Sequence, residues 1–206
     1  MSLILVIIVG YLLGSLPFSF WLGKARGIDL RRVGSGNIGA TNLARVLDAR
    51  WGFLAFILDG GKGFLAVFLA GYISTFFTDN IMSVPMLKIT GGIISILGHN
   101  WSIWVKFKGG KGVATSAGVF VGLAPITLLI VLGIWVAVFI PFGYVSLASL
   151  VAAISLPILM LAGIGGKVAL PIIIFSCIVT VLIIIRHRLN IKRLIQGREN
   201  KFGRRR

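Results

Sequence analysis

Long apolar runs, separated by short polar segments, dominate this chain of 206 residues. A helix needs about 20 consecutive apolar residues to cross a membrane, and most of the runs reach that length. Hydrophobic residues make up 57% of the chain, more than a soluble domain can bury. We therefore predict an all-α, polytopic integral membrane protein with a single domain, residues 1–206. Its seven predicted helical segments are residues 2–22, 51–75, 84–98, 113–123, 125–140, 142–162 and 167–185.

The number of crossings depends on the region 113–185. Its length would hold three full helices, but both of its flanks are basic, which requires an even number of crossings. Pro125 and Pro141 suggest a division into a short helix, residues 113–123, and three longer ones. The short helix could cross only part of the membrane, lining protein or water instead of lipid.

The net charge of +16 is concentrated in three segments, residues 24–50, 98–112 and 186–206, which hold eighteen of the 21 lysines and arginines. The segment 78–83 holds none. By the positive-inside rule, the three basic segments face the cytoplasm, the N-terminus lies outside and the C-terminus is cytoplasmic. Because the basic tail directly follows a membrane span, anionic membrane lipids are its expected partner, and nucleic acid is not.

Two features of the apolar runs concern processing and redox state. The first run lacks a basic leading region and a small-residue cleavage site, so we predict a retained span and not a secretory signal. The single cysteine, Cys177, cannot form an internal disulfide and is predicted to be a small core hydrophobe.

Ionisable side chains within spans are costly and therefore point to a function. Asp59 and Lys62, in the sequence DGGKG, are three residues apart and share one face of a helix. The pair could neutralise itself and fix packing, or it could line a cavity open to the cytoplasm. His99, at the start of the second basic loop, is expected either to be a hydrogen-bonded interfacial residue or to serve the site.

A second polar pair ends the last apolar run. His187 and Asn190 are three residues apart and could face inward together. The neighbouring cations are predicted to be solvated membrane anchors, namely Lys192, Arg193 and Arg204 to Arg206.

Two glycine-rich loops lie in the predicted cytoplasmic segments. The first is VGSGNIGATN, residues 33–42, followed by Arg45; the second is FKGGKGVAT, residues 107–115, which contains Lys111. Each combines unobstructed backbone N–H groups with a cation, and each is expected to lead into a helix whose N-terminus favours anions. The pattern predicts phosphate recognition at the level of the lipid headgroups. Glycines needed only for turns and helix packing would leave the polar side chains of these loops unexplained.

Two familiar nucleotide motifs are excluded. The G-x-G-x-x-G at residues 34–39 would need a strand before it, and its acidic partner Asp59 lies within an apolar span. Neither GGKG sequence is a P-loop, because Lys62 and Lys111 are each followed by glycine instead of serine or threonine.

The chain has few groups for acid–base catalysis: five acids, two histidines and one cysteine. No cluster of metal-ligating residues is visible, and no Ser–His–Asp triad is evident. The soluble acyltransferase pattern H-x-x-x-x-D fails, since Trp104 and Lys192 occupy the aspartate position. Cations and N–H donors suit a reaction with an already activated phosphate leaving group.

These loops, together with YVSLAS at residues 144–149 and RHRLNIKRLIQGRE at residues 186–199, resemble the bacterial acyl-phosphate:glycerol-3-phosphate acyltransferases over essentially the whole chain. The resemblance implies a multi-pass enzyme of the bacterial plasma (inner) membrane with its active site facing the cytoplasm. It would transfer a fatty acyl group from acyl phosphate, and not from acyl-CoA, to the 1-hydroxyl of glycerol 3-phosphate. The products would be lysophosphatidic acid and inorganic phosphate, in the first acylation step of phospholipid synthesis. No cofactor, metal or obligatory protein partner is implied.

The resemblance also implies which residues form the site. A substrate phosphate, and no protein base, would accept the hydroxyl proton. Asp59 and Lys62 receive no catalytic role, and Glu199 would be structural, paired with a nearby arginine. The implied phosphate-binding set is Ser35, Gly36, Asn37, the amides of Ile38 and Gly39, Arg45, Lys111, Ser146, His187 and Asn190. The catalytic subset is Ser35, Asn37, Arg45, Lys111, His187 and Asn190.

Two other classes of function compete with this one. A transporter or channel for phosphate or another small anion would need polar groups along a path through both leaflets. The polar groups here gather at one predicted face instead. A non-catalytic membrane subunit would leave the two anion-binding loops unexplained.

Overall fold

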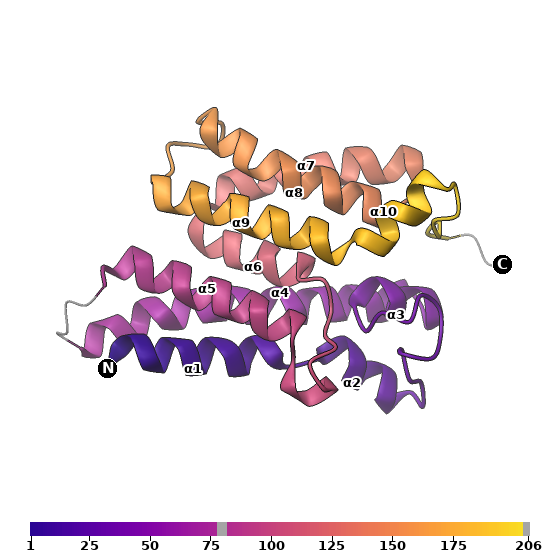
Figure 1. Ribbon diagram of the computed structural model, residues 1–206, viewed down its shortest axis with the longest axis horizontal. Coiled ribbons are helices and arrows are strands. Elements are labelled where there is room, and N and C mark those ends of the chain that lie inside the picture. Colours follow the sequence, from indigo (N-terminus) through magenta and orange to yellow (C-terminus); the bar gives the residue numbers. More distant parts are fainter. Residues whose placement is uncertain (78–81, 204–206) are drawn as a thin grey trace. The chain divides into compact units, whose positions relative to one another are not determined.

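The computed structural model describes residues 1–77 and 82–203, and the chain divides into two compact units, Met1–Leu123 and Ala124–Arg206. All regular structure in the described residues is helical, which confirms the predicted all-α class. The order of the elements can be followed in Figure 1. That the chain forms a single domain, as expected from the sequence, stays a prediction.

In the first unit, α1, α4 and α5 run side by side, with α4 opposite in direction to the other two (Figure 1). Small residues allow this close packing. A methyl group on Gly14 would collide with the backbone of Ser95, and one on Gly118 would collide with the carbonyl of Gly60. The elements are α1 (Ser2–Ser15), α2 (Phe18–Ala25), α3 (Ala40–Val46), α4 (Ala49–Ile73), η1 (Ser74–Phe76), α5 (Val84–Asn100), η2 (Ile103–Val105) and α6 (Val113–Leu123).

In the second unit, α8 packs against both α7 and α9. The chain bends by 61° between α9 and α10. The C-terminal segment then returns to the turn between α7 and α8, where the N–H of Phe202 donates a 2.8 Å hydrogen bond to the carbonyl of Gly143. The helices are α7 (Pro125–Phe142), α8 (Val145–Leu161), α9 (Leu170–Arg186) and α10 (Arg188–Ile195).

Each of the seven predicted apolar segments is helical, but two details were wrong. The first segment is not continuous, because Leu16 and Pro17 leave the helical conformation between α1 and α2. Pro141 does not separate two helices: it lies inside α7, which ends at Gly143 with a φ of +71°. Glycine adopts that left-handed conformation without strain, so it is the stronger stop signal.

Three helical stretches of the described residues are long and apolar enough to cross a membrane, Ser2–Ala25, Ala49–Phe76 and Pro125–Phe142. A fourth is reached if α9 and α10 count as one bent span, and α6 and α8 are shorter apolar helices. Large apolar side chains cover the surface of these helices, as lipid contact requires; Leu129, for example, is 67% exposed.

Cys177 corrects another expectation, since it is exposed on α9 and is not a core residue. The run of isoleucine, leucine and valine around it gave no periodic signal to separate the packed face of α9 from its outer face. Most of the predicted outer turn, at residues 78–81, and Arg204 to Arg206 lie outside the described residues.

Candidate functional site

The first glycine loop is held by the side chain of Asn42, which is 2% exposed. Its Oδ1 accepts a 2.8 Å hydrogen bond from the backbone N–H of Ser35. Its Nδ2 donates to the carbonyls of Leu30 at 3.1 Å and Val33 at 3.0 Å. Gly34, with a φ of +61°, lies so close to Asn42 that a methyl group there would strike Oδ1. Asn42 therefore fixes the path of the loop.

Several backbone N–H groups of this loop are engaged within the loop itself. The N–H of Gly39 donates to Oδ1 of Asn37 at 2.8 Å, and that of Gly36 donates to the carbonyl of Val33 at 3.1 Å. With the N–H of Ser35 held by Asn42, fewer amides face a ligand than the glycine content suggested. The Ser35 hydroxyl and the Asn37 amide group add side-chain donors to the N–H groups that the loop still offers.

The loop leads into α3, as predicted, and this helix carries Arg45. The Arg45 side chain is half-buried. The side chain of Ile38 is 6% exposed and belongs to an apolar cluster around Leu30 and Leu43. Ile38 can therefore offer an anion its backbone N–H, while its side chain anchors the loop to the core.

The second loop contains an unusual backbone. Lys106 and Phe107 have φ values of +55° and +60°, a region that bulky residues rarely adopt. The N–H of Phe107 donates a 2.8 Å hydrogen bond to the carbonyl of Ser102, and that of Lys108 donates to Val105 at 3.2 Å. Such a conformation persists only where the surroundings fix it, and it is typical of ligand-binding segments.

The remainder of this loop packs against the end of α5. Backbone N–H groups of Gly109 and Gly110 donate to the carbonyls of Asn100 and His99, each at 3.1 Å. A methyl group on Gly110 would collide with Nε2 of the His99 ring. The half-buried Lys111 follows directly, and α6 begins two residues later, so the prediction of a helix after this loop is confirmed.

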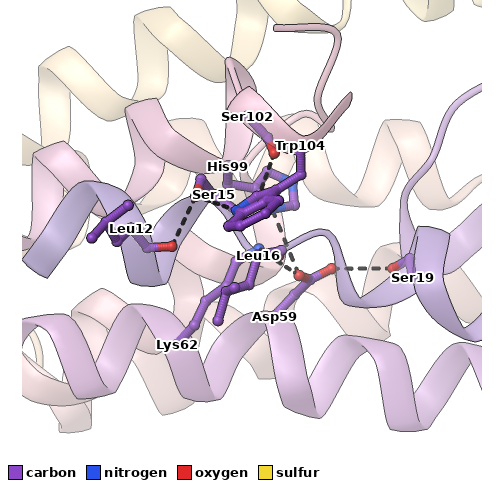
Figure 2. Close-up of polar contacts among 9 residues, drawn as sticks. All are labelled: Leu12, Ser15, Leu16, Ser19, Asp59, Lys62, His99, Ser102 and Trp104. Atoms are coloured by element: carbon purple, nitrogen blue, oxygen red, sulfur yellow. Dashed lines mark hydrogen bonds and ion pairs between the residues drawn. The ribbon is translucent and has the colours of Figure 1, made fainter. Parts of the chain in front are cut away.

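The break between α1 and α2 exposes backbone carbonyls, and side chains satisfy them (Figure 2). The hydroxyl of Ser102 donates to the carbonyl of Ser15, and the ammonium of Lys62 donates to that of Leu16 at 2.6 Å. Unsatisfied carbonyls at membrane depth cost several kcal/mol each, roughly, which explains why polar side chains converge here.

An ionic cluster lies at the same break, as Figure 2 shows. Lys62 Nζ is 2.7 Å from Asp59 Oδ1, so the predicted pair on one helix face is confirmed. Asp59 Oδ2 accepts a 3.1 Å hydrogen bond from the Ser19 hydroxyl, and His99 Nδ1 lies 3.7 Å from Asp59 Oδ1. The carboxylate and the ammonium are 2% and 4% exposed.

The cluster borders a small, partly open recess. Ile38 of the first glycine loop contributes to its wall. The other lining residues are Ser15, Leu16, Pro17, Ser19, Asp59, Lys62, His99 and Ser102. Sequence reasoning left His99 undecided and did not connect it with Asp59, which lies 40 positions earlier on another helix.

In the second unit, His187 and Asn190 are buried at the bend between α9 and α10, with exposures of 3% and 5%. His187 Nδ1 lies 2.8 Å from the carbonyl of Ile183. Asn190 Nδ2 donates a 2.9 Å hydrogen bond to Glu199 Oε1, and Arg193 Nε donates to Oε2 at 2.9 Å. The predicted pairing of Glu199 with an arginine is confirmed. Arg193 itself is therefore not simply a solvated anchor.

Ser146, near the start of α8, is 5% exposed. Burial acts to raise the pKa of Glu199, but hydrogen bonds from Arg193 and Asn190 outweigh it, and Ser146 adds a smaller effect, so this pKa is lowered. The return of the C-terminal segment to the α7–α8 turn thus places Glu199 near Ser146 as well as Asn190.

The predicted set of site residues is divided between the two units. The first holds the two glycine loops with Arg45 and Lys111, and the second holds Ser146, His187 and Asn190. Among the described residues, no three His, Cys, Asp or Glu side chains gather closely enough to hold a metal ion. Sequence reasoning assigned no role to Asn42, although an asparagine just inside a helix that follows a glycine turn is a residue type known to bond the backbone of such loops.

Comparisons with known proteins place these observations in a family. The family model for glycerol-3-phosphate acyltransferase matches residues 4–197. The glycerol-3-phosphate acyltransferase of Geotalea daltonii is 43% identical over 204 residues, covering 98% of this chain and 99% of its own length. That of Aquifex aeolicus is 41% identical over 204 residues, covering 98% and 100%.

Solved structures agree with the sequence relatives. The crystal structure of PlsY, an integral membrane glycerol 3-phosphate acyltransferase, in its glycerol 3-phosphate form has a TM-score of 0.87 and 40% identity, covering 98% of this chain and 96% of that one. Its lysophosphatidic acid form has a TM-score of 0.84 and 39% identity, with the same coverage. This chain is thus a polytopic integral membrane protein, and it belongs to the glycerol-3-phosphate acyltransferase family.

Proposed function

We propose that this enzyme, a glycerol-3-phosphate acyltransferase, uses acyl phosphate as its acyl donor and acylates the 1-hydroxyl of glycerol 3-phosphate. The products are lysophosphatidic acid and inorganic phosphate. The observation that carries the proposal is the engagement of every described carboxylate in a structural contact. Without a free carboxylate base, the reaction favours an activated donor whose phosphate group can itself accept the hydroxyl proton.

The four described acids each have such a contact. Asp29 pairs with Arg31 at 2.7 Å and Lys24 at 3.1 Å, and the hydrogen bond from Arg31 is the main cause of its lowered pKa. Asp48 caps α4 by accepting from the N–H groups of Arg50 and Trp51. Asp59 belongs to the ionic cluster and Glu199 is held by Asn190 and Arg193. The fifth acid, Asp79, lies outside the described residues.

The reaction then proceeds as a direct acyl transfer. The 1-hydroxyl oxygen of glycerol 3-phosphate attacks the carbonyl carbon of the acyl phosphate, and the bond from that carbon to the phosphate oxygen breaks. Inorganic phosphate leaves with the bonding electrons, and a phosphate oxygen takes the hydroxyl proton. Two phosphate groups must approach each other, so the protein has to offset their repulsion with cations and N–H donors.

The chain supplies those donors in its two glycine loops. The Ser35 hydroxyl, the Asn37 amide and the Arg45 guanidinium form one phosphate-binding group, and Lys111 with the second loop forms another. A guanidinium binds a phosphate with two parallel hydrogen bonds, whereas an ammonium acts as a point charge. For Ser146, His187 and Asn190 we keep the phosphate-binding role that the resemblance to the family implies.

We place the active site at the cytoplasmic face of the bacterial inner membrane, with the N-terminus outside. The three basic segments carry this orientation through the positive-inside rule. Single cysteines introduced into a variant without Cys177, at residues 83 and 206, should react with an impermeant reagent from outside only at residue 83, which is exposed. Labelling of residue 206 from outside intact cells would contradict the orientation.

A donor comparison tests the chemistry. Purified protein in liposomes receives labelled glycerol 3-phosphate with either palmitoyl phosphate or palmitoyl-CoA. Lysophosphatidic acid should form from palmitoyl phosphate alone, and the acyl group should be at position 1. Product from palmitoyl-CoA, or an acyl group at position 2, would refute this assignment of donor or of position.

A further inference from the structure

The cluster of Asp59, Lys62 and His99 contains three ionisable groups to which the acyl transfer assigns no role. Lys62 has a sufficient structural explanation, because its ammonium satisfies the carbonyl of Leu16 at the break between α1 and α2. A neutral donor would satisfy that carbonyl without a buried ion pair, whose desolvation is costly. Satisfying the Leu16 carbonyl therefore does not explain why the Asp59 carboxylate lies beside Lys62.

The contacts of His99 indicate what the Asp59 carboxylate does. Nδ1 of the imidazole lies 3.7 Å from Asp59 Oδ1, while Nε2 lies against Gly110, where a methyl group would collide with it. The ring is therefore held between the carboxylate on α4 and the backbone of the second glycine loop. The carbonyl of His99 also accepts the hydrogen bond from the N–H of Gly110, so ring and backbone contact the same loop residue.

The second loop needs such a support. Lys106 and Phe107 occupy the left-handed region of φ without being glycines, and Gly112 has a φ of +83°. A strained segment relaxes unless contacts on both sides fix it. On one side the loop is tied to Ser102, and on the other it is tied to His99 and Asn100 at the end of α5. Lys111 is the residue that directly follows this second attachment.

The same carboxylate also reaches toward the first glycine loop. Asp59 Oδ2 accepts a hydrogen bond from Ser19 on α2, the helix from which the chain continues into that loop. Ile38 of the loop and the cluster line one recess. The cluster thus touches the supports of both loops from one buried position.

We propose that Asp59 and His99 are positioning residues, which hold the second glycine loop so that Lys111 meets its phosphate ligand, a role that rests on the function proposed above. Neither residue contacts substrate in this account. Asp59 orients the imidazole, and the imidazole with its own carbonyl fixes Gly110.

The test needs variants that keep the fold. Asp59→Asn alone would leave the Lys62 ammonium buried without a counter-charge, so the double variant Asp59→Asn/Lys62→Gln is used. It removes both charges together, and the new amides can still bond Ser19 and Leu16. His99→Phe is the second variant, since it keeps a flat ring against Gly110 but has no nitrogen for Asp59. Gly61→Ala is the matched control, because Gly61 lies in the same DGGKG motif with open space around it.

Two readouts are measured in detergent-solubilised protein: hydrogen exchange of the Gly109 and Gly110 amides, and kcat and KM for each substrate. We expect exchange at these amides to quicken by about tenfold or more in both test variants, since their hydrogen bonds open more often. We also expect kcat/KM to fall by about 100-fold, the typical effect of a group displaced by about 1 Å. Gly61→Ala should match the wild type, and the thermal midpoints of all variants should stay close together.

The outcomes separate the claims. Unchanged exchange at Gly109 and Gly110 in both test variants overturns the positioning role, as does quickened exchange with wild-type kinetic constants. A general rise in exchange along the chain, with a lowered thermal midpoint, also overturns it, because the cluster would then serve stability alone. If the wild type makes no product from palmitoyl phosphate, the proposed donor fails, while the exchange data still decide whether the cluster fixes the loop.

Discussion

The Oδ1 atom of Asn42 accepts the backbone N–H of Ser35 at 2.8 Å, across seven residues of the first glycine loop. The same side chain donates to two further carbonyls, so one buried amide closes the loop at three points. The glycines give the loop its freedom, and Asn42 selects one conformation from it. The conformation of the loop is consequently set by contacts within the chain itself.

Asn42→Ala should therefore damage both stability and activity. Removing the amide leaves the N–H of Ser35 and two carbonyls without their partner, at a cost of about 1–3 kcal/mol for each group that stays buried. We expect a lower thermal midpoint and a raised KM for one phosphate substrate. A variant with wild-type stability and KM would show that Asn42 does not shape the loop.

Two glycine variants distinguish the effect of a steric collision with Asn42 from the effect of a strained left-handed backbone. Gly34→Ala should lose activity, because its methyl group would strike Asn42 Oδ1 in addition to the cost of a left-handed alanine. Gly27 has a φ of +74° but open space around it, so Gly27→Ala carries only the backbone cost, about 1 kcal/mol. In steady-state kinetics, Gly34→Ala should therefore be less active than Gly27→Ala. Equal activities would mean that contact with Asn42 is unimportant.

Arg45→Lys tests whether a guanidinium is required. An ammonium keeps the charge but loses the two parallel hydrogen bonds that a guanidinium makes with a phosphate. We expect kcat/KM to fall by at least about tenfold, since charge-assisted hydrogen bonds contribute about 1.5–3 kcal/mol each. Arg50→Lys, at an exposed position next to the cap of α4, is the control and should retain full activity. A fully active Arg45→Lys variant would remove Arg45 from the phosphate-binding group.

Glu199→Gln tests the contacts that hold Asn190. The pKa of Glu199 is lowered in the folded protein, so its ionised form stabilises the fold above the ordinary glutamate pKa of about 4.3. That contribution is lost as the pH falls through the lowered value. We expect the difference in thermal midpoint between wild type and Glu199→Gln to be largest near neutral pH and to shrink under acidic conditions.

The control for this pH dependence is Asp48→Asn, at an exposed acid that caps α4. Its effect on the midpoint should be small at every pH, because asparagine caps a helix about as well as aspartate. A difference between wild type and Glu199→Gln that grows on acidification would contradict the assigned role of the carboxylate.

Much of the helical architecture could be predicted from apolar run length alone. Charge and glycine content located both loops, and the spacing of Asp59 and Lys62 predicted their pairing correctly. The break at Leu16 and Pro17 was missed because a proline within a membrane helix is often tolerated. At Pro17 the helix breaks because polar side chains satisfy the freed carbonyls. These side chains come from distant parts of the chain, so the sequence alone did not reveal them.

The contacts of His99 in the site also come from distant parts of the chain, and the sequence did not predict them. Helical periodicity relates residues three or four positions apart, and it carries no information on a contact between α4 and α5. Likewise, glycine content suggested freely available amides in the first loop. Hydrogen bonds from Ser35, Gly36 and Gly39 within that loop reduce their number, and such bonds depend on the three-dimensional path of the backbone.

The most direct test of the central claim, phosphate recognition by the glycine loops, compares two lysines of the second loop. Lys111→Ala should lower kcat/KM with palmitoyl phosphate and glycerol 3-phosphate by at least about 100-fold, because it removes a charge that stabilises the reacting phosphates. Lys108→Ala removes an exposed charge three residues earlier and should stay within about twofold of the wild type. If both variants turn over like the wild type, the second loop does not bind phosphate and the account is wrong.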